Sequence, residues 1–156
     1  GIKRREGRRP EGVDSLYTLE RLEQMLPLAD IVALCLPGNQ DTYHLMNEER
    51  LALLKKDAVL LNVGRGMTLD TEALTRALQE GRIAGACLDV TDPEPLPSEH
   101  PLWEMDNVIL TPHVSGLFEL PETLEKILDI CIENLECYLV KRPLRNVIDR
   151  KTGYRI

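Results

Sequence analysis

The chain has 156 residues, of which 43% are hydrophobic and 29% are charged, and its formal net charge is −7. This length suits one domain of ordinary size, and the composition is that of a globular protein rather than a disordered one. The acidic balance argues against nucleic acid as a partner, and no apolar run is long enough to span a bilayer, so no membrane partner is expected either.

The four cysteines show none of the short paired spacings that metal sites use, so we expect no metal centre. Cys35 and Cys87 lie inside apolar runs, where a free thiol packs like a small hydrophobic side chain. We therefore expect buried, reduced thiols and a cytoplasmic protein, because no signal peptide opens the chain.

The first half of the chain alternates helical patterns with apolar runs. Leucines at helical spacing predict a helix over 18–25, which the Thr18 side chain would cap. The continuous apolar run 30–36 predicts a strand that is buried on both faces. Asn47 is expected to cap a helix that runs to residue 54, and residues 58–63 predict a second buried strand.

The same alternation continues in the second half. Asp70 is expected to cap a helix that Gly81 terminates. Residues 83–90 predict a third strand, in which Gly85 suggests the close approach of a helix, and residues 107–110 predict a fourth.

The last predicted helix begins at Glu122, carries an apolar stripe and ends at Pro143. The tail 144–148 could add an extended segment elsewhere. Strands and helices in this order predict the α/β class, with a parallel sheet flanked by helices.

Three of the predicted strands are followed by turns that each carry one ionisable side chain: Arg65, Glu94 and His113. Each of them has a plainer explanation when it is taken singly. Arg65 would be a surface turn residue, Glu94 a solvated loop residue and His113 a packed loop residue. Ligands of open parallel sheets bind at the carboxyl ends of the strands, however, where the three side chains would converge. Arginine presents a planar fork to a carboxylate, histidine exchanges a proton near neutral pH, and glutamate can hold and charge that histidine.

The turns also resemble those of the D-isomer-specific 2-hydroxyacid dehydrogenase family, which includes glyoxylate/hydroxypyruvate reductases and phosphoglycerate dehydrogenases. The turns read N-V-G-R-G, D-V-T-D-P-E-P-L and T-P-H-V-S-G, in the family's order and at its separations. Two further segments resemble the family's cofactor loop and its carboxyl tail. The five segments are 36–42, 62–66, 89–96, 111–116 and 143–147, and the resemblance extends over 16–154.

The resemblance implies an NAD(P)(H)-dependent oxidoreductase that acts on the CH–OH group of a small 2-hydroxy acid, or reduces the corresponding 2-keto acid. Arg65 would clamp the substrate carboxylate, a bidentate task that lysine cannot perform. His113 would donate a proton to the keto oxygen, or remove it in the reverse direction, while hydride moves to or from the nicotinamide. Glu94 would hydrogen-bond His113, orient the ring and favour its charged form.

The resemblance also implies which residues bind the cofactor. Asp89 would accept a hydrogen bond from the nicotinamide carboxamide. The other residues predicted around the cofactor are Leu36, Pro37, Thr42, Val63, Gly64, Arg65, His113, Ser115 and Gly116.

The basic start of the chain bears on the choice of cofactor. Lys3, followed by Arg4 and Arg5, holds the place where NAD-dependent members carry an acid for the ribose hydroxyls. Cations pair with a 2′-phosphate, so Lys3 and Arg4 are predicted to bind the cofactor and NADP(H) is favoured over NAD(H). The plainer alternative is a solvated basic end of a strand.

The glycine-rich G-x-G-x-x-G turn of dinucleotide-binding folds is absent from the sequence. In the family this turn precedes the region matched here, together with the central strand and most of the substrate domain. We therefore expect an incomplete Rossmann-type parallel sheet with flanking helices, whose first βαβ unit is missing and which has a gap beside strand 30–36. Residues 1–120 would form a partial dinucleotide-binding domain, and residues 121–156 a carboxy-terminal helix and tail returning toward the absent substrate domain. The 156 residues alone are expected to be unstable and inactive.

One other function remains open, and nucleic-acid binding is weighed against it and rejected. The family fold also serves non-catalytic dinucleotide-sensing modules such as transcriptional corepressors, which the three ionisable residues neither support nor exclude. Nucleic-acid binding rests only on the basic start, which lacks interleaved aromatic residues. The implied partners are a small 2-keto or 2-hydroxy acid and either a second copy in a homodimer or the missing amino-terminal part. The sequence does not identify the acid, because the loops that select it lie largely in the absent domain.

Overall fold

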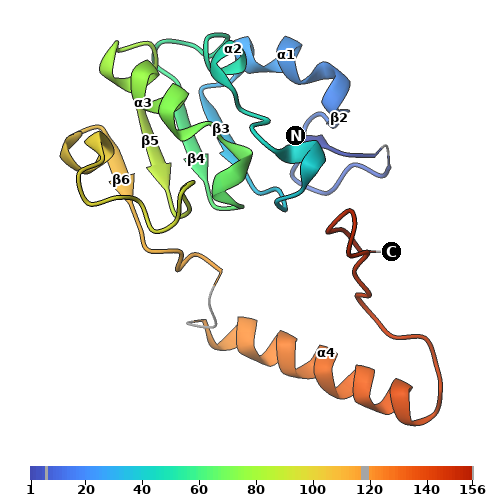
Figure 1. Ribbon diagram of the computed structural model, residues 1–156. Helices are drawn as coiled ribbons and strands as arrows, with labels where there is room; N and C mark the ends of the chain where they lie inside the picture. Colours follow the sequence, from blue (N-terminus) through green and yellow to red (C-terminus); the bar gives the residue numbers. More distant parts are fainter. Residues whose placement is uncertain (6, 117–119, 156) are drawn as a thin grey trace.

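The computed structural model describes residues 1–5, 7–116 and 120–155. Its main body is a parallel sheet of four strands in the order β3-β4-β5-β6 (Figure 1). The strands are β3 (Ile31–Leu34), β4 (Val59–Asn62), β5 (Gly85–Leu88) and β6 (Val108–Leu110). Two short strands, β1 (Ile2–Lys3) and β2 (Tyr17–Thr18), pair in parallel as a separate sheet. The predicted α/β class with a parallel sheet is confirmed.

Short helices connect the strands: α1 (Leu22–Met25), α2 (Glu48–Leu51) and α3 (Thr71–Gln79). Asn47 and Asp70 cap α2 and α3 as predicted, because their side chains accept hydrogen bonds from backbone N–H groups of the first turn. The helix predicted over 18–25 is wrong at its start. Thr18 pairs in β2 and its side chain makes no capping hydrogen bond, so 3-10 turns flank α1 instead.

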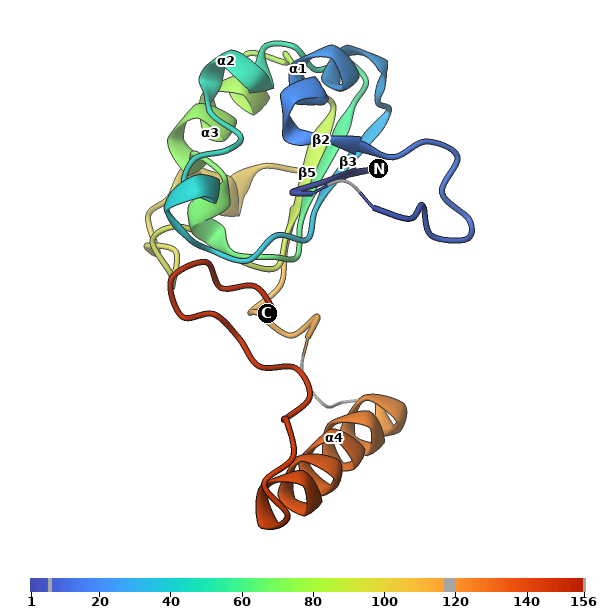
Figure 2. The same cartoon turned by 90° about the vertical axis from the view of Figure 1, so that its right-hand side faces the viewer.

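The three helices all lie on one side of the sheet (Figure 2). Each crossover carries the chain one strand further in the same direction, and right-handed crossovers made in one direction place their helices on one face. Leu60 and Leu88 point to that face and are 0% and 2% exposed, whereas Ile31 and Ile109 on the opposite face are 66% and 61% exposed. The prediction that strand 30–36 is buried on both faces is therefore wrong.

The two sheets do not join. Between β1 and β3 lies an apolar cavity of about 550 Å³, whose lining includes Ile2, Leu22, Leu26, Val32 and Leu34. This cavity is the gap that the sequence predicted beside strand 30–36.

Two expectations about small residues are corrected. A Cβ atom on Gly85 would lie 2.6 Å from the carbonyl oxygen of Asn107. The close neighbour of this glycine is therefore the backbone just before β6, and not a helix. Cys35 and Cys131 are exposed and Cys87 and Cys137 are partly exposed, although all four are free thiols. The prediction of buried thiols fails at Cys35 because the residue follows β3 at the open edge of the sheet.

The helix α4 (Pro121–Leu139) lies apart from the sheet (Figures 1 and 2). It ends before Pro143, where Lys141 adopts a φ of 56° and the Arg142 N–H bonds the Cys137 carbonyl oxygen at 2.8 Å. Apolar side chains along α4 are exposed: Leu124, Ile127, Leu128, Ile132, Leu135, Tyr138 and Leu139. Within the described ranges no helix is both long and apolar enough to cross a bilayer.

The chain beyond α4 returns to the main body (Figure 1). The Asn39 Nδ2 atom donates a hydrogen bond to the Thr152 carbonyl oxygen at 2.6 Å, which fastens the tail beside the segment that follows β3. The tail was expected to turn toward another domain, and this contact with the dinucleotide-binding part was not predicted. The proposed division at residue 120 stays a prediction.

Candidate active site

The turns after β4, β5 and β6 lie together at the carboxyl edge of the sheet, and the turn after β6 holds His113 in an uncommon conformation. The φ of His113 is 56°, in the left-handed region that residues other than glycine rarely adopt. Its N–H lies 2.9 Å from the Asp89 carbonyl oxygen and 3.0 Å from the Thr111 carbonyl oxygen. Strained backbone of this kind clusters at functional sites, where the surrounding contacts hold it.

Glu94 and His113 are in direct contact, as predicted. The His113 Nδ1 atom lies 2.7 Å from the Glu94 Oε1 atom, although the two residues come from different turns. Their side chains are 43% and 42% exposed, so a ligand can reach them. Because the carboxylate engages Nδ1, the Nε2 atom is the ring nitrogen available for proton exchange with a ligand.

Arg65 lies on the neighbouring turn. A Cβ atom on Gly66 would collide with the Thr91 carbonyl oxygen, so this turn packs directly against the loop that carries Glu94. Arg65 is exposed, and its Nη1 atom donates to the Gly64 carbonyl oxygen at 2.7 Å. Among the described contacts the guanidinium bonds neither Glu94 nor His113, which leaves its remaining N–H groups for a ligand.

Asn62, the last residue of β4, is 0% exposed and stabilises the turn that carries Arg65. The Asn62 amide donates to the Arg65 carbonyl oxygen at 3.1 Å and accepts from the Gly64 N–H at 3.1 Å. A buried amide that is satisfied by the turn itself fixes the course of the backbone at Arg65.

Asp89 at the end of β5 anchors the turn that contains His113. Its Oδ1 atom accepts from the Thr111 hydroxyl at 2.5 Å and the Val114 N–H at 2.9 Å. Its Oδ2 atom accepts from the Ser115 N–H at 3.0 Å and the Ser115 hydroxyl at 2.6 Å. These four hydrogen bonds fill the lone-pair positions of a carboxylate.

The hydrogen bonds also set the ionisation of Asp89, which is 5% exposed. Burial alone raises the pKa of this carboxyl, but the hydrogen bonds from Ser115, Thr111 and Val114 outweigh burial and hold the pKa far below its usual range. Asp89 is therefore a stable anion.

Asp89 and Ser115 were both predicted to bind the cofactor, and these roles stay predictions. In the structure, the Asp89 carboxylate accepts four hydrogen bonds from the chain itself. Ser115 likewise donates its hydroxyl hydrogen to Asp89. The sequence held a signal for this arrangement, because hydroxyl residues flank His113 on both sides.

The residues predicted around the cofactor are divided between surface and interior. Val63 is 42% exposed at the end of β4, and Gly116 is exposed after the His113 turn. A Cβ atom on Gly64 would lie 2.6 Å from the Leu36 carbonyl oxygen, so the two turns pack backbone to backbone. Thr42 is only 2% exposed and donates to the Pro37 carbonyl oxygen at 2.7 Å, so it supports the loop from within rather than lining its surface.

Lys3 and Arg4 lie near the predicted cofactor loop. Together with Leu36 and Pro37 they line the cavity between β1 and β3. Tyr154 in the tail, which the sequence reasoning did not single out, lines the same cavity.

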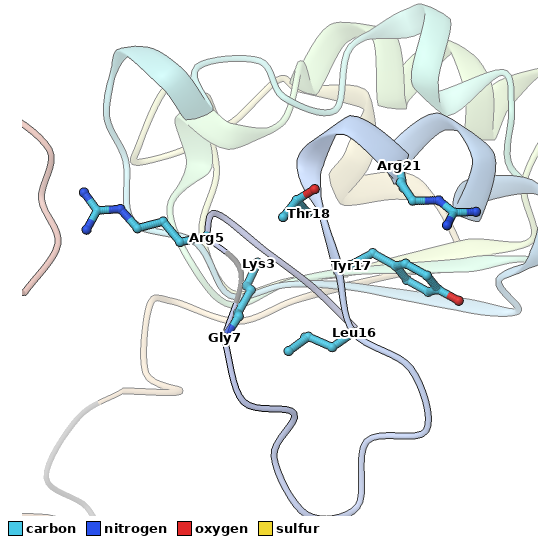
Figure 3. Close-up of a pocket in the computed structure, with 7 residues that line it drawn as sticks. All are labelled: Lys3, Arg5, Gly7, Leu16, Tyr17, Thr18 and Arg21. Atoms are coloured by element: carbon cyan, nitrogen blue, oxygen red, sulfur yellow. The ribbon is translucent and has the colours of Figure 1, made fainter.

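A second, basic cavity of about 410 Å³ lies beside β1 (Figure 3). Lys3, Arg5 and Arg21 line it together with uncharged residues, and no acidic side chain of the described chain does so. Arg21 was missed because it is distant from Lys3 in sequence and reaches the cavity only through the pairing of β1 with β2. The three cations that line this cavity fit the phosphate groups of a nucleotide.

Comparison with known proteins supports this arrangement. A profile of the family described as "D-isomer specific 2-hydroxyacid dehydrogenase, NAD binding domain" matches residues 3–115. A glyoxylate reductase of Thermofilum pendens is 47% identical over 114 residues, which are 73% of this chain and 33% of that protein. An uncharacterized protein of Corynebacterium melassecola is 43% identical over 95% of this chain and 48% of its own length. The chain thus spans about half the length of the latter relative.

Solved structures agree. An NADPH-dependent glyoxylate/hydroxypyruvate reductase of Sinorhizobium meliloti, in complex with NADP and sulfate, superposes with a TM-score of 0.86 at 30% identity over 99% of this chain and 48% of that one. A D-isomer specific 2-hydroxyacid dehydrogenase of Xanthobacter autotrophicus, in complex with NADPH and MES, gives 0.82 at 39% identity over 95% of this chain and 61% of that one. The sequence match and the shared fold together establish that the chain belongs to the D-isomer specific 2-hydroxyacid dehydrogenase family, with residues 3–115 matching its NAD-binding domain.

Proposed function

We propose that the protein is an oxidoreductase that interconverts a small 2-keto acid and the corresponding 2-hydroxy acid, with NADPH as its preferred reductant. The contact of 2.7 Å between His113 Nδ1 and Glu94 Oε1, beside the turn of Arg65, carries the proposal. A proton-exchanging ring, a carboxylate that holds it and a cation for an acid are the groups that such a reaction needs.

In the proposed reaction each residue has one task. Arg65 binds the substrate carboxylate and orients the keto group. His113 gives the Nε2 proton to the keto oxygen during reduction and takes it back during oxidation, while Glu94 holds the ring in place through Nδ1. When bound, the reduced nicotinamide supplies the hydride.

The cofactor preference rests on the basic residues around β1. Lys3 and Arg4 are proposed to pair with the ribose 2′-phosphate, and Leu36, Pro37, Val63 and Gly64 to contact the cofactor through backbone and apolar groups. The relatives from Sinorhizobium meliloti and Xanthobacter autotrophicus were solved with NADP and with NADPH, which supports the preference.

Steady-state turnover of glyoxylate and of hydroxypyruvate, with NADPH and with NADH, tests the function. The assay uses the full-length protein, by which we mean this chain together with the amino-terminal part that the family carries. We expect consumption of the reduced cofactor with both acids and a higher kcat/KM with NADPH. Tight NADPH binding without turnover of either acid would instead favour the alternative of a non-catalytic dinucleotide sensor.

Arg65→Lys is expected to raise KM for the keto acid by about 10- to 100-fold, because an ammonium group cannot reproduce the bidentate contact with a carboxylate. Arg76→Lys is a matched control, since Arg76 lies on α3 and pairs with Glu48 at the surface. An unchanged KM in Arg65→Lys would remove Arg65 from the substrate site.

The isolated 156-residue chain is expected to show no keto-acid reduction, whereas the full-length protein is active. The exposed apolar residues of α4 and the bare face of the sheet support a partner, either a second copy in a homodimer or further protein outside this chain. Turnover measured side by side for the two polypeptides checks this expectation, and equal kcat values would contradict it.

A further inference from the structure

The end of the chain forms a small closed hairpin, Ile148–Arg155, which returns to the carboxyl edge of the sheet (Figures 1 and 2). The Asp149 N–H bonds the Tyr154 carbonyl oxygen at 2.9 Å, and the Gly153 N–H bonds the Asp149 carbonyl oxygen at 2.8 Å. Gly153 makes the turn possible with a φ of 70°. These bonds give Tyr154 a defined position at the tip of the chain.

Two contacts fasten this C-terminal hairpin to the dinucleotide-binding part. The Asn39 amide donates to the Thr152 carbonyl oxygen at 2.6 Å, and the same Asn39 side chain accepts from the Thr42 N–H at 3.1 Å. The Arg4 guanidinium carbon lies 3.9 Å from the centre of the Tyr154 ring. The hairpin therefore touches both the loop after β3 and the basic residues after β1.

The stacking of Arg4 on Tyr154 suits phosphate recognition. A guanidinium that rests its face on an aromatic ring keeps its N–H donors at the edge, in the plane in which they meet a phosphate as a fork. Both side chains are half-buried, which restricts the rotamers that a long arginine otherwise samples. A ring that fixes the guanidinium lowers the entropy lost when a phosphate binds.

We propose that Tyr154 is a positioning residue of the cofactor site, which holds the Arg4 guanidinium for the 2′-phosphate of NADPH. The C-terminal hairpin thereby contributes to the choice between NADPH and NADH. This inference rests on the proposed function, since it assumes that Arg4 meets the 2′-phosphate.

Isothermal titration of the full-length protein with 2′,5′-ADP and with 5′-ADP tests the inference without any turnover. We expect Tyr154→Leu to weaken 2′,5′-ADP binding by about two- to five-fold and to leave 5′-ADP binding unchanged. Tyr154→Phe, which keeps the ring, retains the affinity of the unmodified protein. In an Arg4→Ala background, Tyr154→Leu causes no further loss, because the tyrosine acts through the arginine.

Three results would overturn the inference: unchanged 2′,5′-ADP affinity in Tyr154→Leu, equal weakening of both nucleotides, or the same loss with and without Arg4. Equal weakening of 2′,5′-ADP and 5′-ADP binding would show that Tyr154 has a structural role. Unfolding curves of Tyr154→Leu and Tyr154→Phe test that structural role independently of binding. If the unmodified protein binds the two nucleotides equally, the preference for the 2′-phosphate fails together with this inference. If keto acids are not reduced but the binding results hold, only the proposed reaction fails.

Discussion

Replacing His113 with asparagine is expected to lower kcat/KM for keto-acid reduction by about 1,000-fold, while the Kd for NADPH stays unchanged. The variant lacks the group that gives a proton to the keto oxygen, and general acid catalysis is worth about 100- to 10,000-fold. Asparagine tolerates the left-handed backbone that His113 adopts at a φ of 56°, so the turn keeps its shape. Steady-state kinetics and titration with NADPH measure the two quantities.

Glu94→Gln serves as the comparison for this variant. Glutamine still contacts the ring but carries no charge, so we expect a smaller loss than in His113→Asn. A His113→Asn variant that kept more than a tenth of the activity would show that another group supplies the proton.

Replacing Asp89 with asparagine is expected to lower the free energy of unfolding by about 3 kcal/mol or more. The carboxylate accepts four hydrogen bonds, and each bond to a charged group contributes about 1.5–3 kcal/mol. The asparagine amide would direct N–H groups toward the N–H and hydroxyl donors that now bond the carboxylate. Activity is expected to fall as well, because the turn that carries His113 loses its anchor.

Urea unfolding at several pH values checks the prediction for Asp89. The pKa of this carboxyl is lowered in the folded protein, so its stabilising contribution is complete above the pKa of the unfolded chain, about 3.9, and is lost as the pH falls toward the folded pKa. The difference between the unmodified protein and Asp89→Asn should therefore be large at pH 7 and shrink below about pH 4. Asp92→Asn, an exposed change in the same loop, is the control, and a constant difference at all pH values would contradict the assignment.

The strands and the site residues after them were largely predictable because each rests on a local pattern. The apolar runs at β4 and β5 and the caps Asn47 and Asp70 are encoded within a few residues of each element. Glu94 and His113 could be paired because parallel strands deliver their following turns to one edge.

What the sequence did not reveal depends on contacts between distant segments. Burial of β3 was predicted from composition, but its exposure depends on which face the crossovers cover. The stacking of Arg4 on Tyr154 joins the two ends of the chain, and no sequence pattern around either residue indicates the other. The hydroxyl residues beside His113 are visible in the sequence, but their common acceptor Asp89 lies 22 residues before Thr111 and 26 before Ser115, and the pairing of β5 with β6 brings them together.

The open edge of β3 has a consequence for handling the isolated domain. Among the described strands, β3 has one neighbour, so its other side presents unpaired backbone groups next to the exposed Ile31. Such an edge recruits strands from other molecules, which leads to aggregation as the concentration rises. Ile31→Lys would oppose this association, because it adds charge to the edge at an exposed position outside the core.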